Sequence, residues 1–546
     1  MIQRVLNRAK SVCSTVMLGL LLSGCGDPGE CIRCDTLVIA ATGEPTALLP
    51  PLVGETVGRD VSDLVFERLL SLRGGAAPTD ETAFAPALAS RWQRTDSLTL
   101  RFTLRPGARW HDGRPVTSHD VVFSFGAYVD TALGGPAGSV LGGRATASAE
   151  SDSVVTIRFR APDAEQLFDA VWHVRVIPRH VWDSVPRARW AEDTSPARLV
   201  GSGPYRVAEW ARGQSLTLER ADTAAEAPAI RRIVWRFAGD QDAALNLVLS
   251  HEADLLESIG DSARVARVAS DTSIRTVPYP SAVYGFLGFN LAGAADSPLR
   301  DPRVRRALFQ STDRHTAARA VYGPASTAPP GPMSGILWIN DDSIAVPPFD
   351  SVAARRSLEQ AGWHRLGPGR RKNGRDLTVD ILVPGTSPAR RSLAQILLEQ
   401  WRQVNVPATI TSVDFPVFQE RLRTGRFESF VGAWLDEPSP RGIGEQWTAA
   451  GVGGLNYGKY RNRAFDSLVG RALAAGRDPA RARRIWREAM DTLNADAPAI
   501  WLYTPVNVAA ASTRVEGLRI DPYSWLAALP EWRLGPARRA PRAAEP

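Results

Sequence analysis

Several residues in this chain have types that could do chemistry, but few have the spacing that a catalytic site needs. His111 and Asp112 adjoin in a Trp-His-Asp-Gly turn, where an aspartate that caps the backbone beside an interfacial histidine is the common arrangement. His251 and Glu252 begin a zinc-protease-like pattern, but Leu255 stands where the second histidine belongs. No Gly-x-Ser-x-Gly nucleophile elbow occurs. The sequence therefore predicts no catalytic residues and no enzyme activity.

A second segment has part of a phosphate-binding pattern. Gly453 to Lys459 fits Gly-x-x-x-x-Gly-Lys, but Tyr460 stands where a Ser or Thr must contact magnesium, and no clean helix follows. The seven histidines of the chain show no metal-ligand spacing. We interpret the segment as a glycine-rich loop and expect neither a cofactor nor a metal.

Cys31 and Cys34 form a Cys-x-x-Cys pair. A redox pair would open a helix after a strand, and the flanking residues indicate neither. A zinc site needs two more ligands, and the only other cysteine beyond the first 24 residues is Cys25. A small disulfide in an oxidising compartment and a pair of inert thiols remain as alternatives.

The beginning of the chain has the pattern of an export signal. Three basic residues precede the apolar run 12–22, which is too short to span a bilayer as a permanent helix. The run ends in Leu-Ser-Gly-Cys25, which resembles a bacterial lipobox, where cleavage occurs before a cysteine that carries lipid on its sulfur. We expect a lipoprotein signal peptide over 1–24, lipidation of Cys25 and a tether over 25–35. The alternative is an ordinary signal peptide with a chance cysteine.

The composition is that of a folded protein without a nucleic-acid-binding face. The chain is 44% hydrophobic and 23% charged. Its net charge is +7, but the basic residues are scattered among acidic ones. The one clear basic cluster, Arg538, Arg539 and Arg542, belongs to a tail over 536–546 that we interpret as an untethered end. No nucleic-acid partner is expected.

The apolar pattern predicts alternating strands and helices. Residues 36–40 form a β-type run, and 97–104 alternate polar and apolar residues as a half-buried strand does. Thr117 and Asp120 have the spacing of a capping box at the start of a helix. The segment 377–434 predicts a β-α-β-α-β unit with parallel strands and right-handed crossovers.

Ligands of such sheets bind beyond the carboxyl ends of the strands. The stretch Trp434 to Pro438 directly follows the third strand of the unit. It is therefore placed where a ligand is expected.

Four segments together carry a resemblance that covers nearly the whole exported chain. They are APALASRWQRTDSLTLRFTLRPGARWHDGRPVTSHDVVFSF (85–125), GSGPYRVAEW (201–210), FNLAGAADSPLRDPRVRRALFQSTDR (289–314) and SVAARRSLEQAGW (351–363). In this order they resemble the extracellular solute-binding proteins of family 5, the dipeptide, oligopeptide and nickel class that serves ABC importers. Such motifs shape the lobes and do not contact the ligand.

The resemblance implies an α/β fold of the periplasmic binding protein type (type II, three-lobed), with two ligand-clasping halves and a hinge. The expected division is lobe I over 36–70, 191–280 and 496–535, lobe II over 71–190, and lobe III over 281–495. The hinge would be the two chain crossings near 280 and 495. Closure around a ligand would be a rigid-body movement about this hinge.

The function that the resemblance implies is that of a lipid-anchored, monomeric receptor outside the cytoplasmic membrane. It would capture a peptide or peptide-like solute and deliver it to an ABC permease and its ATPase. The alternatives are a sensory or scaffolding lipoprotein that keeps the fold, a receptor for a nickel complex, an oligosaccharide or another non-peptide solute, and an unrecognised secreted enzyme.

The resemblance also suggests site residues. Peptide-binding members pair the peptide's amino terminus with a carboxylate just beyond a strand that has a tryptophan near its end. The corresponding stretch makes Asp436 the first candidate and Glu437 the second, with Trp434 and Tyr284 beside them in the expected ligand-binding set. The spacing from Trp434 to Asp436 is shorter than in oligopeptide binders. The alternative is a solvated loop in which either carboxylate caps the turn before Pro438.

Overall fold

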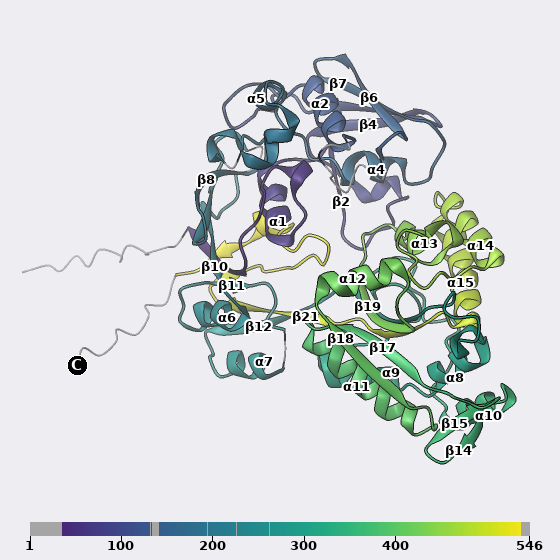
Figure 1. Cartoon of the computed structure of the whole chain (residues 1–546). Coiled ribbons are helices and arrows are strands. Elements are labelled where there is room, and N and C mark those ends of the chain that lie inside the picture. Colours follow the sequence, from purple (N-terminus) through teal and green to yellow (C-terminus); the bar gives the residue numbers. More distant parts are fainter. Residues whose placement is uncertain are drawn as a thin grey trace, which may run out of the picture.

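The structure is a computed structural model that describes residues 35–536, except 131–132, 134–140, 194, 225–226 and 261. The expected signal peptide, Cys25, the Cys31–Cys34 pair and the basic tail from residue 537 lie outside the described residues. Three large sheets form the centres of three lobes (Figure 1). No helix within the described part of the chain is long and apolar enough to cross a membrane.

Lobe I is built on a seven-stranded sheet that collects strands from distant parts of the chain. In spatial order the strands are β12 (Ile274–Pro280), β21 (Val506–Ser512), β11 (Leu255–Leu256), β1 (Thr36–Thr42), β10 (Arg232–Ala238), β9 (Ser215–Arg220) and β8 (Tyr205–Ala211). The run predicted over 36–40 is the central strand β1, parallel to both of its neighbours. Its even and odd residues enter two different buried clusters, because successive side chains point to opposite faces of a sheet.

Helices cover both faces of this sheet. The helices α6 (Gln241–Leu249) and α7 (Ser262–Ala269) contribute to the buried cluster on one face. The helix α1 (Thr56–Val65) packs into the cluster on the other face. The carboxyl end of α1 leads directly toward lobe II.

Lobe II has a four-stranded antiparallel sheet and short helices. The strands, in spatial order, are β4 (Ala89–Asp96), β5 (Thr99–Leu104), β7 (Val154–Phe159) and β6 (Ala145–Ser151); the helices are α2 (Ser118–Tyr128) and α4 (Gln166–Trp172). The short helix α5 (Arg179–Trp182) lies at the boundary, because its Trp182 packs into the lobe I core. The predicted capping box starts α2, where the Thr117 backbone N–H donates to the Asp120 carboxylate over 2.8 Å. The small ladder of β2 (Leu70–Leu72) and β3 (Phe84–Pro86) lies at the lobe I boundary.

Lobe III holds the predicted β-α-β-α-β unit. Its sheet runs β18 (Ala408–Val413), β17 (Val379–Pro384), β19 (Ser429–Leu435), β13 (Val283–Phe289) and β20 (Ala499–Tyr503), and α11 (Pro388–Arg402) and α12 (Phe415–Thr424) connect β17 to β18 and β18 to β19. The three strands of the unit pair in parallel, as predicted. Ser387 is the N-cap of α11, and the Leu393, Leu397 and Trp401 side chains of this helix are fully buried.

Further helices surround this sheet: α8 (Pro302–Gln310), α9 (Arg314–Tyr322), α10 (Ser351–Gln360), α13 (Arg441–Trp447), α14 (Arg463–Ala474) and α15 (Pro479–Asp496). A small sheet is formed by β14 (His364–Leu366), β15 (Gly369–Lys372) and β16 (Arg375–Asp376). Another small sheet pairs β22 (Val515–Glu516) with β23 (Arg533–Leu534). Asp301 is the N-cap of α8, and its side chain accepts a hydrogen bond from the Arg303 N–H over 2.9 Å.

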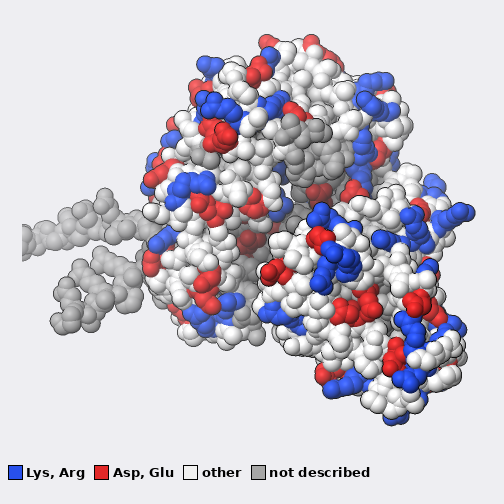
Figure 2. All heavy atoms as spheres, in the orientation of Figure 1, with Lys and Arg blue, Asp and Glu red and all other residues white. Residues whose placement is uncertain are grey.

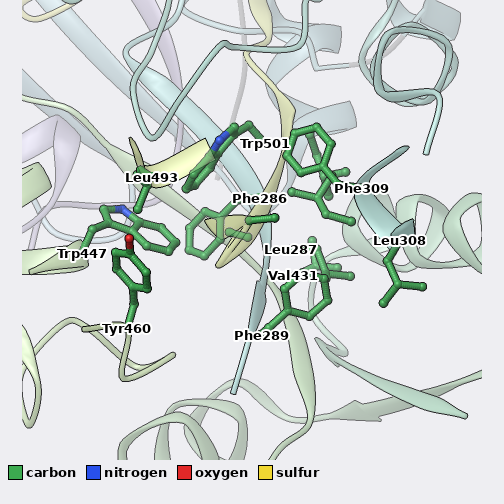
Figure 3. Close-up of a cluster of buried hydrophobic side chains, with 14 of the residues drawn as sticks. Phe286, Leu287, Phe289, Leu308, Phe309, Val431, Trp447, Tyr460, Leu493 and Trp501 are labelled. Atoms are coloured by element: carbon green, nitrogen blue, oxygen red, sulfur yellow. The ribbon is translucent and has the colours of Figure 1, made fainter. Parts of the chain in front are cut away.

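Aromatic rings fill the centre of lobe III (Figure 3). Phe286 of β13 meets the ring of Trp447 at 5.2 Å and that of Trp501 at 6.3 Å, and the two tryptophans form an edge contact at 4.9 Å. Edge contacts of this kind add to the stabilisation from burial alone. This core fixes the strands that lead to the candidate site.

The structure corrects two of the predicted lobe boundaries. The first crossing, predicted near residue 280, lies between β12 and β13. The second crossing was predicted near 495, but β20 still pairs with β13 in the lobe III sheet. The chain therefore returns to lobe I only after Tyr503, the last residue of β20. The predicted end of lobe II at 190 is also too late, because Trp182 and Trp190 are part of the lobe I core. In both cases the deciding contacts join segments far apart in the sequence.

Candidate functional site

One cleft is shared by all three lobes. Its volume is about 620 Å³. Its walls include Arg59, Asp60, Asp63, Glu257, Tyr279, Tyr523 and Trp525 of lobe I, Arg68, Tyr128, Phe168, Trp172, His173 and Arg175 near and in lobe II, and Leu337, Trp434, Asp436, Glu437, Arg441 and Gln446 of lobe III. On the face in Figure 2 the surface is hollowed where the upper lobe meets the other two. Charged and aromatic side chains therefore converge on one enclosed space.

Asp436 lies in this cleft just beyond the end of β19, as predicted. Its backbone N–H donates to the Ala282 carbonyl over 2.8 Å, which ties the loop to the start of β13. Its carboxylate accepts the Ser334 backbone N–H over 2.6 Å. Burial raises the pKa of Asp436 to about 7, although the Ser334 hydrogen bond acts in the opposite direction. Within the described chain no Lys or Arg lies within ion-pair distance of this carboxylate.

Glu437 is next to Asp436 and also lines the cleft. Its side chain is exposed. Burial between the walls raises the pKa of Glu437, and the negative charge of Asp169 across the cleft raises it further. Two adjacent carboxyl groups thus face the cleft from lobe III, and both would be stabilised in the charged form by a cation.

Trp434 and Tyr284 lie opposite each other in the β13–β19 pair, but they have different places in the site. Trp434 lines the cleft and stacks on Tyr457 with ring centroids 6.1 Å apart. Tyr284 is fully buried and is not part of the cleft wall. Its hydroxyl donates to Oε1 of Gln446 over 2.5 Å and accepts from Nε1 of Trp447 over 3.3 Å. Tyr284 thus holds Gln446, which does line the cleft, and its contact with the ligand stays a prediction.

The most extensive charge cluster at the cleft was missed from the sequence. Arg441, the first residue of α13 in lobe III, donates to both carboxylate oxygens of Asp169 in lobe II over 2.7 and 2.9 Å. It also lies 3.0 Å from Asp163 and 3.2 Å from Glu165. Ser439 donates to Glu165 over 2.5 Å. These contacts join lobe II to lobe III across the cleft.

Burial governs the titration of this cluster. It raises the pKa of Glu165 to about 7 and raises that of Asp169, while Arg441 acts in the opposite direction on both. Burial and the positive charge of Arg441 lower the pKa of the nearby His173 to about 3. His173 is therefore a neutral wall residue at physiological pH.

The other chemically suggestive residues are structural. The Gly201 N–H donates to Nδ1 of His111 over 3.1 Å, and Nε2 lies 3.0 Å from the Gly203 carbonyl oxygen. The predicted glycine-rich stretch is a loop braced by Asn456, whose side-chain amide donates to two backbone carbonyls. Among the described residues no group of three His, Cys, Asp or Glu is arranged to hold a metal ion.

Three lobes around one cleft, with a carboxylate beyond a strand end and a bridge between lobes, define a protein that encloses a solute. The sequence profile described as "Bacterial extracellular solute-binding proteins, family 5 Middle" matches residues 83–452, which is more than half of the chain. The chain belongs to this family. The family consists of extracellular solute-binding proteins and not of enzymes, so the prediction of a non-catalytic function is confirmed.

Curated relatives and solved structures match this chain over almost its full length. The chain is 24% identical over 511 residues to the oligopeptide-binding protein AppA of Bacillus subtilis, covering 91% of each chain. It is 23% identical to the dipeptide-binding protein of Escherichia coli, over 90% of this chain and 93% of that one. The structure of AppA in complex with a nonapeptide superposes with a TM-score of 0.73, covering 92% of this chain and 99% of the other.

A neighbour with a different ligand superposes equally well. NikZ from Campylobacter jejuni, in complex with Ni(L-His), also gives a TM-score of 0.73, with 21% identity over 92% of this chain and 100% of that one. The predicted three-lobed binding-protein fold is thereby confirmed. The fold alone therefore does not identify the solute.

Proposed function

We propose that this protein is the lipid-anchored binding component of an ABC importer, and that it captures a peptide or peptide-like solute through its amino group. The observation that carries the proposal is Asp436: a largely buried carboxylate at the strand end, held by the Ser334 and Ala282 backbones. An ammonium group would provide the charge partner that the site lacks. Two relatives that match nine-tenths of the chain are named as peptide binders, which supports the same solute class.

The cleft suits an extended solute. Its 620 Å³ accommodate a few amino-acid residues, and its walls come from three lobes, so closing the lobes surrounds the solute on several sides. Only the closed arrangement contacts the solute from both halves, and the solute therefore favours closure. The closed, loaded form would then dock on the permease.

The deciding experiment is calorimetry with synthetic peptides of two to six residues, in parallel with their N-acetylated forms. Free peptides should bind to the wild type, whereas acetylation should weaken binding by about 100-fold, because it removes the ammonium charge. Asp436→Asn should lose the preference for the free amine; Asp466→Asn, at the N-terminus of α14 outside the cleft, is the matched control. Equal binding of both peptide forms by the wild type would contradict the amino-group anchor.

A second candidate is a non-peptide solute such as a nickel complex, because NikZ superposes as well as AppA does. Mass spectrometry of small molecules released from the purified protein separates the two. A metal complex without peptide in that extract would favour the second candidate.

A further inference from the structure

Two arginines face each other where the chain crosses from lobe I to lobe II. Arg68 and Arg175 occupy directly opposed positions of an isolated antiparallel bridge. The neighbouring Val176 N–H donates to the Glu67 carbonyl over 2.8 Å, so the two chain segments are held in register. Like charges directly opposite each other destabilise such a pair unless something compensates them.

A single carboxylate compensates both guanidinium groups. Asp63 accepts from Nε of Arg175 over 2.5 Å and from Nη2 of Arg68 over 3.0 Å. The side chains of Arg175, Arg68 and Asp63 retain only 10, 18 and 12% of their exposure. Two positive charges and one negative charge are thus taken out of bulk water together, which leaves one positive charge in excess.

The remaining neighbours do not neutralise this charge. Arg68 also contacts Trp172, through the backbone carbonyl at 3.0 Å and the ring face at 5.0 Å, and both groups are uncharged. The phenol of Tyr128 lies beside Arg175, and burial keeps it protonated by raising its pKa. Burial and the nearby Glu257 raise the pKa of Asp60, and its carboxylate accepts a hydrogen bond from the indole N–H of Trp525. A raised pKa reduces the negative charge that Asp60 contributes, so this residue offsets the excess positive charge only weakly.

The group opens into the cleft. Arg68, Arg175, Tyr128 and the neutral His173 are all part of its wall. The acidic residue Asp436 lies on lobe III, whereas this cationic group lies at the lobe I–lobe II crossing. The cleft therefore presents opposite charges from two different bodies of the protein.

We infer that Arg68 and Arg175 form an anion subsite that receives a carboxylate group of the solute. Planar guanidinium groups bind carboxylates with two parallel hydrogen bonds, and because Asp63 offsets only one of the two guanidinium charges, one positive charge is left for the solute carboxylate. The inference rests on the proposed function, because it specifies the solute as one that carries an anion in addition to an amine. The anion is either a terminal carboxylate or an acidic side chain.

The test uses oligoalanines of two to six residues as free acids, as C-terminal amides, and as amides with one internal glutamate. In the wild type the free acid should bind about tenfold or more tightly than the amide. If the glutamate-containing amide recovers the affinity, the subsite takes side-chain carboxylates; if it does not, the subsite takes the terminal carboxylate. Free acid, plain amide and glutamate-containing amide binding equally would overturn the subsite.

Variants separate this subsite from a structural ion pair. Arg68→Gln and Arg175→Gln should bring the free acid to the affinity of the amide, while the amide itself binds as before. Asp63→Asn removes the competing carboxylate and should increase the preference for the acid, an outcome that a purely structural cluster would not give. Arg101→Gln, in an exposed pair with Glu150 of lobe II, is the control. If Arg175→Gln does not fold, the other two variants decide.

A second probe keeps the subsite and the peptide proposal distinguishable. If no oligoalanine binds in any form, the peptide assignment fails, and the subsite is decided by thermal shift with glutarate against glutaramide. Glutarate should raise the Tm of the wild type, and it should do so less in Arg68→Gln. Equal shifts with glutarate and glutaramide would overturn the anion subsite even if peptides bind.

Discussion

Arg441 of lobe III holds Asp169 of lobe II with two hydrogen bonds of 2.7 and 2.9 Å. The Asp169 side chain is 1% exposed and that of Arg441 is 19% exposed, so the pair is shielded from solvent screening. The same guanidinium reaches Asp163 and Glu165. Contacts between lobes in the absence of solute bias the protein toward the closed arrangement.

Arg441→Gln should therefore favour the open arrangement. Removing one partner of a shielded pair leaves Asp169 without its cation, which costs the closed state on the order of 2 kcal/mol. Small-angle scattering of the unliganded variant should give a larger radius of gyration than that of the wild type. Arg371→Gln, in an exposed pair with Asp376 of lobe III, is the control and should not change the radius. An unchanged radius in both variants would argue against a bridge that holds the lobes.

Binding of a free peptide should depend on pH through Asp436. Its pKa in the unliganded protein is about 7, and an ammonium partner lowers it in the complex. The affinity therefore rises as pH increases toward 7, and it falls again above about 8, where the peptide amine itself loses its proton. Calorimetry at pH 5.5 should give binding about 20-fold weaker than at pH 7.5. Asp436→Asn should bind weakly at both values and lose this dependence.

The free energy of unfolding of the unliganded protein should depend on pH in the opposite direction: it should fall as the pH rises, whereas the affinity for peptide increases. Because the pKa of Asp436 is higher in the folded than in the unfolded state, ionisation opposes folding as pH rises from about 4 to 7. Asp436→Asn removes that cost and keeps an acceptor for the Ser334 N–H. Urea unfolding should show equal stability near pH 4 and an advantage for the variant at pH 8, on the order of 2–4 kcal/mol. A variant that is less stable at pH 8 would contradict the buried-charge account.

Tyr284→Phe tests whether this tyrosine supports Gln446 or contacts the solute. The substitution removes the hydrogen bond to Gln446 and leaves Nε1 of Trp447 without its acceptor. We expect a loss of roughly 1–2 kcal/mol in the free energy of unfolding, and a peptide affinity within about threefold of wild type, under ~0.7 kcal/mol. A drop of two orders of magnitude in affinity at unchanged stability would instead show direct contact with the solute.

The proposed lipid anchor is tested at Cys25. Cys25→Ser removes the sulfur that would carry the lipid, and the variant should appear in the soluble fraction after cell fractionation, whereas the wild type sediments with membranes. Gly26 and not Asp follows the cysteine, so the signal for retention in an inner membrane is missing. Equal membrane retention of both forms would count against acylation.

The sequence predicted those parts of the fold that depend on local signals. The β-α-β-α-β unit followed from apolar periodicity, and the position of Asp436 just beyond β19 followed from that unit. Arg441 was not predicted, because its partner Asp169 is 272 residues away and no local pattern connects them. The pairing of Arg68 with Arg175, which are 107 positions apart, was not predicted for the same reason. The burial of Tyr284 was not predicted either, because its hydroxyl bonds to Gln446 and Trp447, which are 162 and 163 residues away.

The two crossings between lobe I and lobe III are hydrogen-bonded neighbours almost to the point where they leave each lobe. Pro280 stands opposite Val506 in lobe I, and Gly285 stands opposite Tyr503 in lobe III. Because the two crossings are paired at both ends, we expect this hinge to resist sideways bending more than two separate linkers would. The restricted path would bring a solute held by Asp436, as proposed above, against the opposite wall in the same orientation at every closure.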